Sequence, residues 1–341
     1  MGIFKKSKDL LKIFFAVDIH GSTACFKKFL NALDVYGADV GILGGDLSGK
    51  MIVPIIKHPD GTYEYNYLGE HIVTKDPQKL KEIEKKLSFM GNYYAYLTEE
   101  EYQELLKEGK TVEGRIDEKR RRITLAAGKV EELFAKVVTD RLHEWLDLAE
   151  ERLSKTGKKL YIVPGNDDIP EVDEVIKKHE SDHIIFADMR KVYVGKHEMI
   201  GLSWSNKTPW DTPRETDEDG LRKMIDDLAS QIENMDWAIF QFHVPPYGTR
   251  LDEAPKLDEQ LRPKVDETIH AGSTAVYEAI KKYQPLLGLH GHIHESRAVE
   301  KIGRTIVFNP GSEYTEAILR GVLIILDENK GKIKNYIFTS G

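Results

Sequence analysis

Several short apolar segments of this chain break off directly into Asp, Asn or His. The first, KIFFAVDIH at residues 12–20, has the continuous apolar character of a strand that is buried on both faces. A helical pattern over 23–36 follows, and then a second apolar run, ADVGILGGDL at 38–47. Strand, helix and strand in this order predict a parallel pair of strands and therefore an α/β fold.

The polar residues at these strand ends are all of types that bind metal ions. They are Asp18 and His20, Asp46, Asn166, His243, and His292 with His294. Ligands of α/β sheets gather at the carboxyl ends of the strands, so we expect these side chains to lie close together. In Asp18-x-His20 and His292-x-His294, alternate residues of an extended segment point the same way, and each pair can reach one small volume.

The mixture of ligand types limits the metals. Carboxylate and amide oxygens with imidazole nitrogens, and no thiolate, suit first-row ions such as Mn, Fe, Co, Ni or Zn, with Mn expected to work best in vitro. Seven ligands are too many for one ion and reasonable for two. Two divalent ions roughly 3.5–4 Å apart are a standard device for hydrolysing phosphoesters. The sequence therefore predicts a dinuclear metal centre and a phosphoesterase.

The blocks D-x-H, G-D, G-N-D, H and G-H-x-H, in this order, resemble the calcineurin-like metallophosphoesterase superfamily. HVPPYGTRLDEAP, GSTAV, GHIHES and VFNPGSEY more narrowly resemble its phosphodiesterase-type branch, which is related to bacterial cyclic-nucleotide phosphodiesterases. The resemblance implies a four-layer α/β/β/α sandwich of two mixed β-sheets. It also implies that a metal-bridging hydroxide hydrolyses a small or nucleotide-like phosphodiester. A phosphomonoesterase or a nuclease is the alternative, and a metal-free scaffold is disfavoured by the intact ligand set.

The resemblance also implies a role for each block. One metal would be held by Asp18, His20 and His294, the other by Asn166, His243 and His292, and Asp46 would bridge the two. Asp46, Asn166 and Asp167 are the residues implied in catalysis. His290 shares the alternation of its neighbours but is not expected to be a ligand, because it sits within the predicted strand and the superfamily pattern does not use it.

The segment YIVPGNDDIP, residues 161–170, would by itself predict only a turn that caps a helix, since Asn and Asp are preferred there. The other blocks make Asn166 a predicted ligand and leave Asp168 as the predicted cap of a helix beginning near Pro170. Many superfamily members have His where this chain has Asp167. An Asp beside two cations should have a lowered pKa and be a poor general acid. We therefore predict that the leaving group is protonated by water or needs little protonation, or that Asp167 orients a water or a histidine.

Three further residues, Tyr247, Asn206 and Asn309, are predicted to contact the substrate. An aromatic ring such as that of Tyr247 could stack on a base. Asn309 lies in Asn-Pro-Gly, which fits a turn as well as a pocket rim.

Residues 51–157 interrupt the core pattern of 1–50 and 158–341. They predict a mostly helical insertion that contains a β-hairpin turning at 59–61, with helices near 77–90, 98–109 and 117–155. The insertion is a candidate cap or homodimer interface. The run at 119–122, Lys-Arg-Arg-Arg, is expected to be a solvated helical turn rather than a phosphate grip.

Composition narrows the function classes. The net charge of −8 argues against a protein that grips long nucleic acids by their phosphates. The single cysteine, Cys25, excludes an intrachain disulfide and fits a reducing compartment. No apolar run has the length that a membrane span needs. We therefore expect a cytoplasmic enzyme with a small phosphorylated substrate and no membrane partner.

Overall fold

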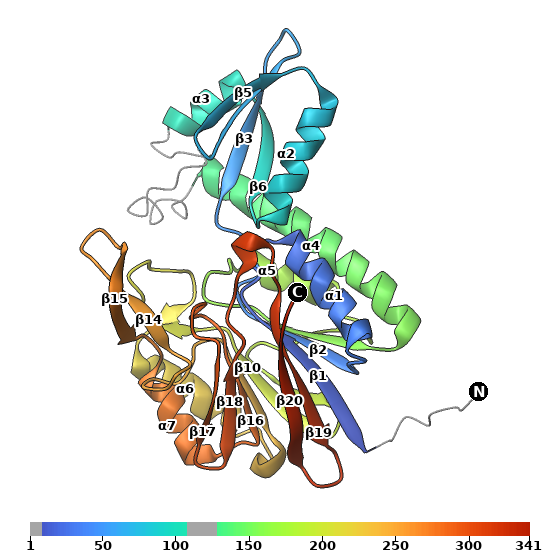
Figure 1. Cartoon of the computed structure of the whole chain (residues 1–341), viewed down its shortest axis with the longest axis vertical. Helices are drawn as coiled ribbons and strands as arrows, with labels where there is room; N and C mark the ends of the chain where they lie inside the picture. Colours follow the sequence, from blue (N-terminus) through green and yellow to red (C-terminus); the bar gives the residue numbers. More distant parts are fainter. Residues whose placement is uncertain (1–8, 108–127) are drawn as a thin grey trace.

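Two six-stranded sheets form the centre of the molecule in the computed structural model, which describes residues 9–107 and 128–341 (Figure 1). The first sheet has the order β20-β19-β1-β2-β7-β8 and the second the order β17-β18-β16-β13-β10-β9. The strands of the first sheet are β1 (Leu10–Ala16), β2 (Val40–Gly44), β7 (Lys159–Val163), β8 (Ile184–Phe186), β19 (Arg320–Asp327) and β20 (Lys332–Ser340). Those of the second are β9 (Lys191–Val194), β10 (His197–Leu202), β13 (Ile239–Phe242), β16 (Leu287–Leu289), β17 (Ala298–Ile302) and β18 (Thr305–Asn309).

Both sheets are mixed. Strands β1, β2, β7 and β8 are parallel, and β19 pairs with β1 antiparallel. In the second sheet β10, β13, β16 and β18 are parallel, while β9 and β17 are antiparallel edges. The carboxyl ends of the parallel strands therefore meet at one edge of each sheet, as predicted from the strand-end pattern.

Helices cover the outer face of each sheet (Figure 1). The first sheet carries α1 (Thr23–Val35), α4 (Lys129–Thr156) and α5 (Glu171–Lys178), and the second carries α6 (Glu218–Ala229) and α7 (Thr274–Tyr283). Strand β1 shows how alternation builds these layers, since Phe14 and Ala16 pack in the helix-side core while Ile13 and Phe15 pack between the sheets. The predicted four-layer α/β/β/α sandwich is confirmed.

The insertion contains more strand than predicted. A four-stranded sheet, with the order β5-β4-β3-β6, lies at one end of the sandwich (Figure 1). Its elements are β3 (Ile52–Lys57), β4 (Tyr63–Tyr67), β5 (Glu70–Thr74) and β6 (Tyr93–Thr98), accompanied by α2 (Pro77–Phe89) and α3 (Glu99–Lys107). The predicted hairpin is present as β3 and β4, but β3 also pairs in parallel with β6. The paired strands are far apart in the sequence and are not joined by a tight turn, so turn residues could not predict this pairing.

Local side-chain caps fix the starts of two helices in the insertion. The capping box at the start of α3 is formed, because Thr98 N donates to Glu101 Oε2 at 2.7 Å and Glu101 N donates to Thr98 Oγ1 at 3.2 Å. Asp76 caps α2 and Pro77 occupies its first turn. The predicted helix start at 117 and the basic run at 119–122 lie outside the described residues.

The long helix α4 differs from the predicted scheme, which placed it in the insertion. It contacts β6 of the insertion but also α1, α5 and β7 of the core. Leu146 and Leu153 of α4 lie in the same buried cluster as Phe14 and Leu160 of the first sheet. The helix therefore serves as the crossover between the parallel strands β2 and β7. The division into core and insertion stays a prediction.

Two small strand pairs flank the second sheet. They are β11 (Ser205–Asn206) with β12 (Glu215–Thr216), and β14 (Glu253–Leu257) with β15 (Pro263–His270). Neither pair was predicted, because their sequences lack a clear alternation of apolar and polar residues. Among the described residues, no helix has the length and apolar character needed to cross a bilayer.

Candidate metal centre

The predicted ligands lie on loops that leave the carboxyl ends of strands in both sheets. Backbone hydrogen bonds hold these loops together. Asp18 N donates to Gly45 O at 3.0 Å and His20 N donates to Asp46 O at 2.9 Å, which joins the loop after β1 to the loop after β2. In the second sheet Gly291 N donates to His243 O at 2.9 Å. The main chain therefore fixes the positions of the ligand-bearing residues.

Two clusters of potential ligands result. One contains Asp18, His20, Asp46 and His294, and the other contains Asp46, His243 and His292; in each, one candidate ligand atom per residue lies within 4.8 Å of all the others. Asp46 belongs to both. Its Oδ2 lies 3.6 Å from His20 Nε2 and its Oδ1 lies 3.4 Å from His243 Nε2. One carboxylate with an oxygen toward each cluster is the arrangement expected of a bridging ligand.

Unpaired buried atoms point to bound cations. Asp18 Oδ1, Asn166 Oδ1 and His243 Nε2 are buried and have no hydrogen-bond partner among the described residues. The amide nitrogen of Asn166 donates to Thr212 Oγ1 at 2.8 Å, which orients its carbonyl oxygen away from that partner. Buried polar atoms normally have partners, so unpaired atoms on three of the predicted ligands fit the presence of bound cations. The oxygen and nitrogen donors present fit two divalent first-row ions.

The backbone at the ligands is strained. Asp18, His20, Asp46 and His292 all have positive φ, at 52°, 36°, 45° and 67°. Such values are uncommon for residues with a side chain and concentrate at functional sites. Gly45, with φ of 111°, shows how tightly the loops meet, because a Cβ there would lie only 1.9 Å from His243 Nδ1. The folded scaffold therefore holds the ligands in a geometry that their local preferences disfavour.

Burial and charge set the protonation of the site. Burial raises the pKa of Asp18 well above its usual value. Burial would also raise the pKa of Asp46, but the charges of His243 and His20 outweigh it and hold that pKa well below its usual range. Burial lowers the pKa of His292 to about 3. The pKa of His243 is raised to about 9, because the charge of Asp46 overcomes the effect of burial.

These directions describe the centre without cations, in which His243 carries the positive charge beside Asp46. A bound divalent ion would take over that role, since an imidazole must be neutral to bind a metal.

Asp168 has a different role from the one predicted. It does not cap α5, whose N-cap is Pro170 with no side-chain hydrogen bond. The fully buried carboxylate of Asp168 accepts hydrogen bonds from Leu47 N at 3.0 Å, Ser48 N at 2.7 Å and Gly165 N at 2.8 Å. The prediction was wrong because local helix-cap chemistry was considered alone. The loop after β2 passes close enough to Asp168 to use the same carboxylate.

Asp167 lies at the site together with a residue that the sequence analysis did not identify. Lys50 Nζ lies 2.5 Å from Asp167 Oδ2, and Asp167 N donates to Asp46 Oδ1 at 3.0 Å. Burial raises the pKa of Asp167, and the charge of Lys50 opposes that rise. Two bound cations would lower the pKa of Asp167. The prediction that Asp167 is ionised applies to that metal-bound state and stays a prediction. The signal for Lys50 was a lone cation directly after the block GDLSG.

Tyr314 is a second residue that was missed. Its ring centroid lies 4.6 Å from that of His20 and 5.9 Å from that of His294, so it packs against two imidazoles of one cluster. It is the last residue of VFNPGSEY, which the resemblance to the phosphodiesterase-type branch already singled out.

The predicted substrate contacts have different surroundings. Tyr247 is 45% exposed and its ring centroid lies 5.7 Å from that of His270. Asn206 Oδ1 is buried without a partner among the described residues. Both stay predictions. Asn309, in contrast, is completely buried; its amide donates to Leu251 O at 3.1 Å and accepts from Gly311 N at 2.8 Å. Asn309 therefore braces the loop, and its substrate contact stays a prediction.

The predicted exclusion of His290 agrees with its surroundings. Its Nδ1 lies 2.9 Å from Phe242 O and 3.1 Å from Val244 O, and it belongs to neither ligand cluster. Burial lowers the pKa of His290 to about 4, so a neutral ring links the backbone of the neighbouring strand to β16.

Comparisons with known proteins agree with this architecture. No protein-family model matches the chain. "Uncharacterized protein MJ1162" of Methanocaldococcus jannaschii is 30% identical over 172 residues, which are 50% of this chain and 72% of that protein. The chain belongs to the family of MJ1162. Among solved structures, TT1561 of Thermus thermophilus has a TM-score of 0.51 at 16% identity, and the match covers 97% of this chain and 98% of that chain.

A dimetal phosphatase from Danio rerio is more distant, with a TM-score of 0.41 at 8% identity over 93% of this chain and 96% of that chain. The likeness to TT1561 shows a shared fold over almost the full length of both proteins. This fold is the metallophosphoesterase fold that the sequence motifs imply.

Proposed function

We propose that this protein is a dinuclear metal-dependent phosphodiesterase that hydrolyses a small or nucleotide-like substrate. The observation that carries the proposal is the shared carboxylate of Asp46, which directs one oxygen toward each ligand cluster. Divalent ions bound there would supply Lewis acidity for the phosphoryl oxygens and a hydroxide nucleophile near neutral pH. Manganese is the ion we expect to support the highest activity in vitro.

The chain's own residues would perform the remaining tasks. The strained loops that carry Asp18, His20 and Asp46 hold oxygen and nitrogen donors in place before any ion binds, so little reorganisation is needed. His20 is buried and His292 is partly buried, and both have lowered pKa values, which favours the neutral imidazole that a metal requires. Tyr247 and Asn206 are proposed to contact the substrate beside the centre.

The assignment to diesters rests on the resemblance to the phosphodiesterase-type branch. We also propose a cytoplasmic location. The insertion is the proposed interface of a homodimer. The chain's net charge of −8 supports a small substrate rather than a long nucleic acid.

The test uses the purified chain stripped of metal and reloaded with Mn²⁺, Co²⁺, Ni²⁺, Zn²⁺ or Fe²⁺. We expect about two ions per chain by elemental analysis and turnover of bis(p-nitrophenyl) phosphate, with slower turnover of p-nitrophenyl phosphate. Asp46→Asn should weaken the binding of both ions and reduce turnover on the order of 10³-fold. Absence of turnover with every one of these ions would contradict the proposal. A large preference for the monoester would replace phosphodiesterase by phosphomonoesterase.

A further inference from the structure

The loop that follows β2 brings a cation to the metal centre. Lys50 pairs with Asp167 at 2.5 Å, and the backbone of Asp167 donates to Asp46, the carboxylate that both ligand clusters share. The pair therefore lies directly beside the middle of the proposed dinuclear centre. Neither member belongs to either ligand cluster.

The ion pair is more exposed than two of the candidate ligands beside it. The side chains of Lys50 and Asp167 are 32% and 18% exposed, whereas those of Asp18 and His20 are 0% exposed. Lys50 and Asp167 are therefore both accessible from solvent, and they are adjacent to the shared carboxylate.

The backbone around Lys50 is held firmly. Ser48 N donates to the buried carboxylate of Asp168 at 2.7 Å, and Gly49 N donates to the hydroxyl of Tyr93 at 3.0 Å. Gly49 also fits against the carbonyl of Gly91 so closely that a Cβ at position 49 would lie 2.0 Å from that oxygen. The loop is thus held between the segment that precedes α5 and the insertion, and the backbone of Lys50 has a fixed position.

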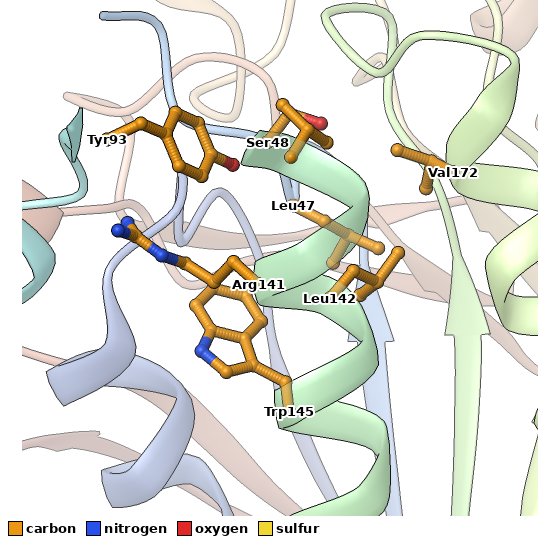
Figure 2. A pocket seen from close by; sticks show the side chains of 8 residues that line it. Leu47, Ser48, Tyr93, Arg141, Leu142, Trp145 and Val172 are labelled. Atoms are coloured by element: carbon orange, nitrogen blue, oxygen red, sulfur yellow. The ribbon is translucent and has the colours of Figure 1, made fainter. Parts of the chain in front are cut away.

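The insertion residue in this clamp is itself supported. Figure 2 shows the hydroxyl of Tyr93 directed toward the segment with Ser48, and Arg141 of α4 beside the Tyr93 ring. The Arg141 guanidinium lies 4.4 Å from the ring centroid, and its Nη1 donates to Gly21 O at 3.0 Å in the loop after β1. One arginine therefore ties Tyr93 to the loop that presents His20.

We propose that Lys50 is a substrate-contacting residue that donates a hydrogen bond to a phosphoryl oxygen, and that Asp167 is its positioning partner. This inference rests on the proposed function for its setting. A lysine is a compact charge with three donors and is suited to phosphate oxygens. Asp167 holds the ammonium group beside the centre when no phosphate is bound. Lys50 supplies the cationic donor that the carboxylate at position 167 cannot supply.

The experiment compares Lys50→Met, Lys50→Arg and Asp167→Asn with the wild type, all loaded with Mn²⁺. The control is Lys158→Met, which removes another lysine paired at 2.5 Å with an aspartate, Asp34, at the amino end of β7, away from the ligands. Three quantities are measured: ions bound per chain, the dissociation constant of inorganic phosphate by calorimetry, and kcat and KM for bis(p-nitrophenyl) phosphate.

We expect Lys50→Met to keep its ions and to weaken phosphate binding about 10-fold or more, with kcat/KM reduced about 10²-fold. Lys50→Arg should retain part of the phosphate affinity, because the charge and the donors remain. Asp167→Asn should lower kcat/KM about 10-fold with a smaller change in phosphate affinity, as expected for a positioning residue. Lys158→Met should stay within about two-fold of the wild type for every quantity.

A chemical rescue separates the missing ammonium group from a distorted loop. Lys50→Cys alkylated with 2-bromoethylamine restores an ammonium group at nearly the same reach. The only native cysteine, Cys25, is buried, so the reaction is directed to position 50. Phosphate affinity should return toward the wild-type value after alkylation and not in a sample treated with iodoacetamide.

Unchanged phosphate affinity in Lys50→Met would overturn the inference. Loss of the bound ions from every Lys50 variant would also overturn it, because Lys50 would then act on the metal centre instead of the substrate. Failure of the proposed function gives a different pattern: the wild type binds ions and phosphate but hydrolyses no ester. In that case Lys50-dependent phosphate binding would still support the contact proposed here.

Discussion

The loops of the two central sheets meet at the same centre but bring different ligands to it. Loops of the first sheet carry the candidate oxygen donors Asp18 and Asp46, the predicted ligand Asn166 and a single imidazole, His20. Loops of the second sheet carry only imidazoles, those of His243, His292 and His294. The negative charge of the centre is therefore concentrated on one sheet. The second sheet contributes imidazoles without a carboxylate, and Asp46 faces both clusters.

The two sets of loops are also braced differently. On the first sheet the buried carboxylate of Asp168 accepts three backbone N–H groups from two loops. On the second sheet His290 and Asn309, both without net charge when buried, hold the loops through backbone carbonyls. We infer that the loops of the first sheet position the charged ligands, and that the loops of the second sheet orient the imidazole ligands. The predictions below test that division.

The largest effect is expected for Asp46→Asn, since it removes the one charge that both ligand clusters share. Loss of the bridging carboxylate should cost several kcal/mol of transition-state stabilisation, which is on the order of 10³-fold in kcat/KM. Both ions should bind more weakly, as measured by elemental analysis after dialysis. Retention of two ions with near-normal turnover would show that the clusters are independent of this carboxylate.

A smaller and asymmetric effect is expected when one imidazole of the second sheet is replaced. His294→Gln should reduce occupancy of the cluster with Asp18, and His292→Gln should reduce occupancy of the cluster with His243. Each variant should retain about one ion per chain and lose about 10²-fold in turnover. Excess Mn²⁺ should restore part of the activity, because the charged donors of the first sheet remain. Loss of both ions from either variant would contradict two separable clusters.

Asp168→Asn tests the brace of the first sheet. The amide keeps the volume but loses the charge that accepts hydrogen bonds from Leu47, Ser48 and Gly165, so we expect about 1–3 kcal/mol less stability and about 10- to 100-fold less activity. Asp217, whose side chain caps α6 by accepting from Gly220 N, is the control. Asp217→Asn should change stability by at most about 1 kcal/mol and leave kcat/KM unchanged. Equal effects of the two variants would restore the view of Asp168 as a simple cap.

The sequence was sufficient for the features that depend on one strand end at a time. A buried strand followed by Asp-x-His or Gly-Asp carries its own signal, so the fold and the clustered ligands could be predicted before their geometry was known. Asp168 was misread because it makes its decisive contacts with a loop far away in sequence. A helix cap is a local explanation, and at this position tertiary contacts took its place.

Lys50 and the parallel pairing of β3 with β6 were missed for a related reason. Lysines are normally solvated, and the position of Lys50 directly after the block GDLSG is a weak signal that does not by itself separate it from a surface lysine. Its partner, Asp167, lies 117 residues further along the chain. The ion pair between Lys50 and Asp167 can be recognised only in the folded structure, where the insertion packs against the loop after β2.

An effect on stability alone is expected at the junction of the two sheets, away from the ligands. Asp188 follows β8 of the first sheet and its carboxylate accepts from Ser203 N at 2.8 Å and Ser203 Oγ at 2.7 Å, directly after β10 of the second. Burial raises the pKa of Asp188 from 3.8 to about 6, although Ser203 and Arg214 oppose the rise. The folded state therefore binds more protons than the unfolded state between about pH 4 and 6, and this group's stabilising contribution falls as pH rises through that window.

Asp188→Asn should remove this dependence. Relative to the wild type, the variant's free energy of unfolding in urea should rise by about 2–3 kcal/mol between pH 4 and pH 6, because a shift of about two pKa units corresponds to that energy. Ser203→Ala provides the opposite control. It removes a hydrogen bond that favours the charged carboxylate, so the pKa of Asp188 should rise further. The fall of the free energy of unfolding with pH should then extend to higher pH than in the wild type. A stability difference that is independent of pH in both variants would mean that the charge of Asp188 is solvated, and that the sheets do not meet through a buried carboxyl at this point.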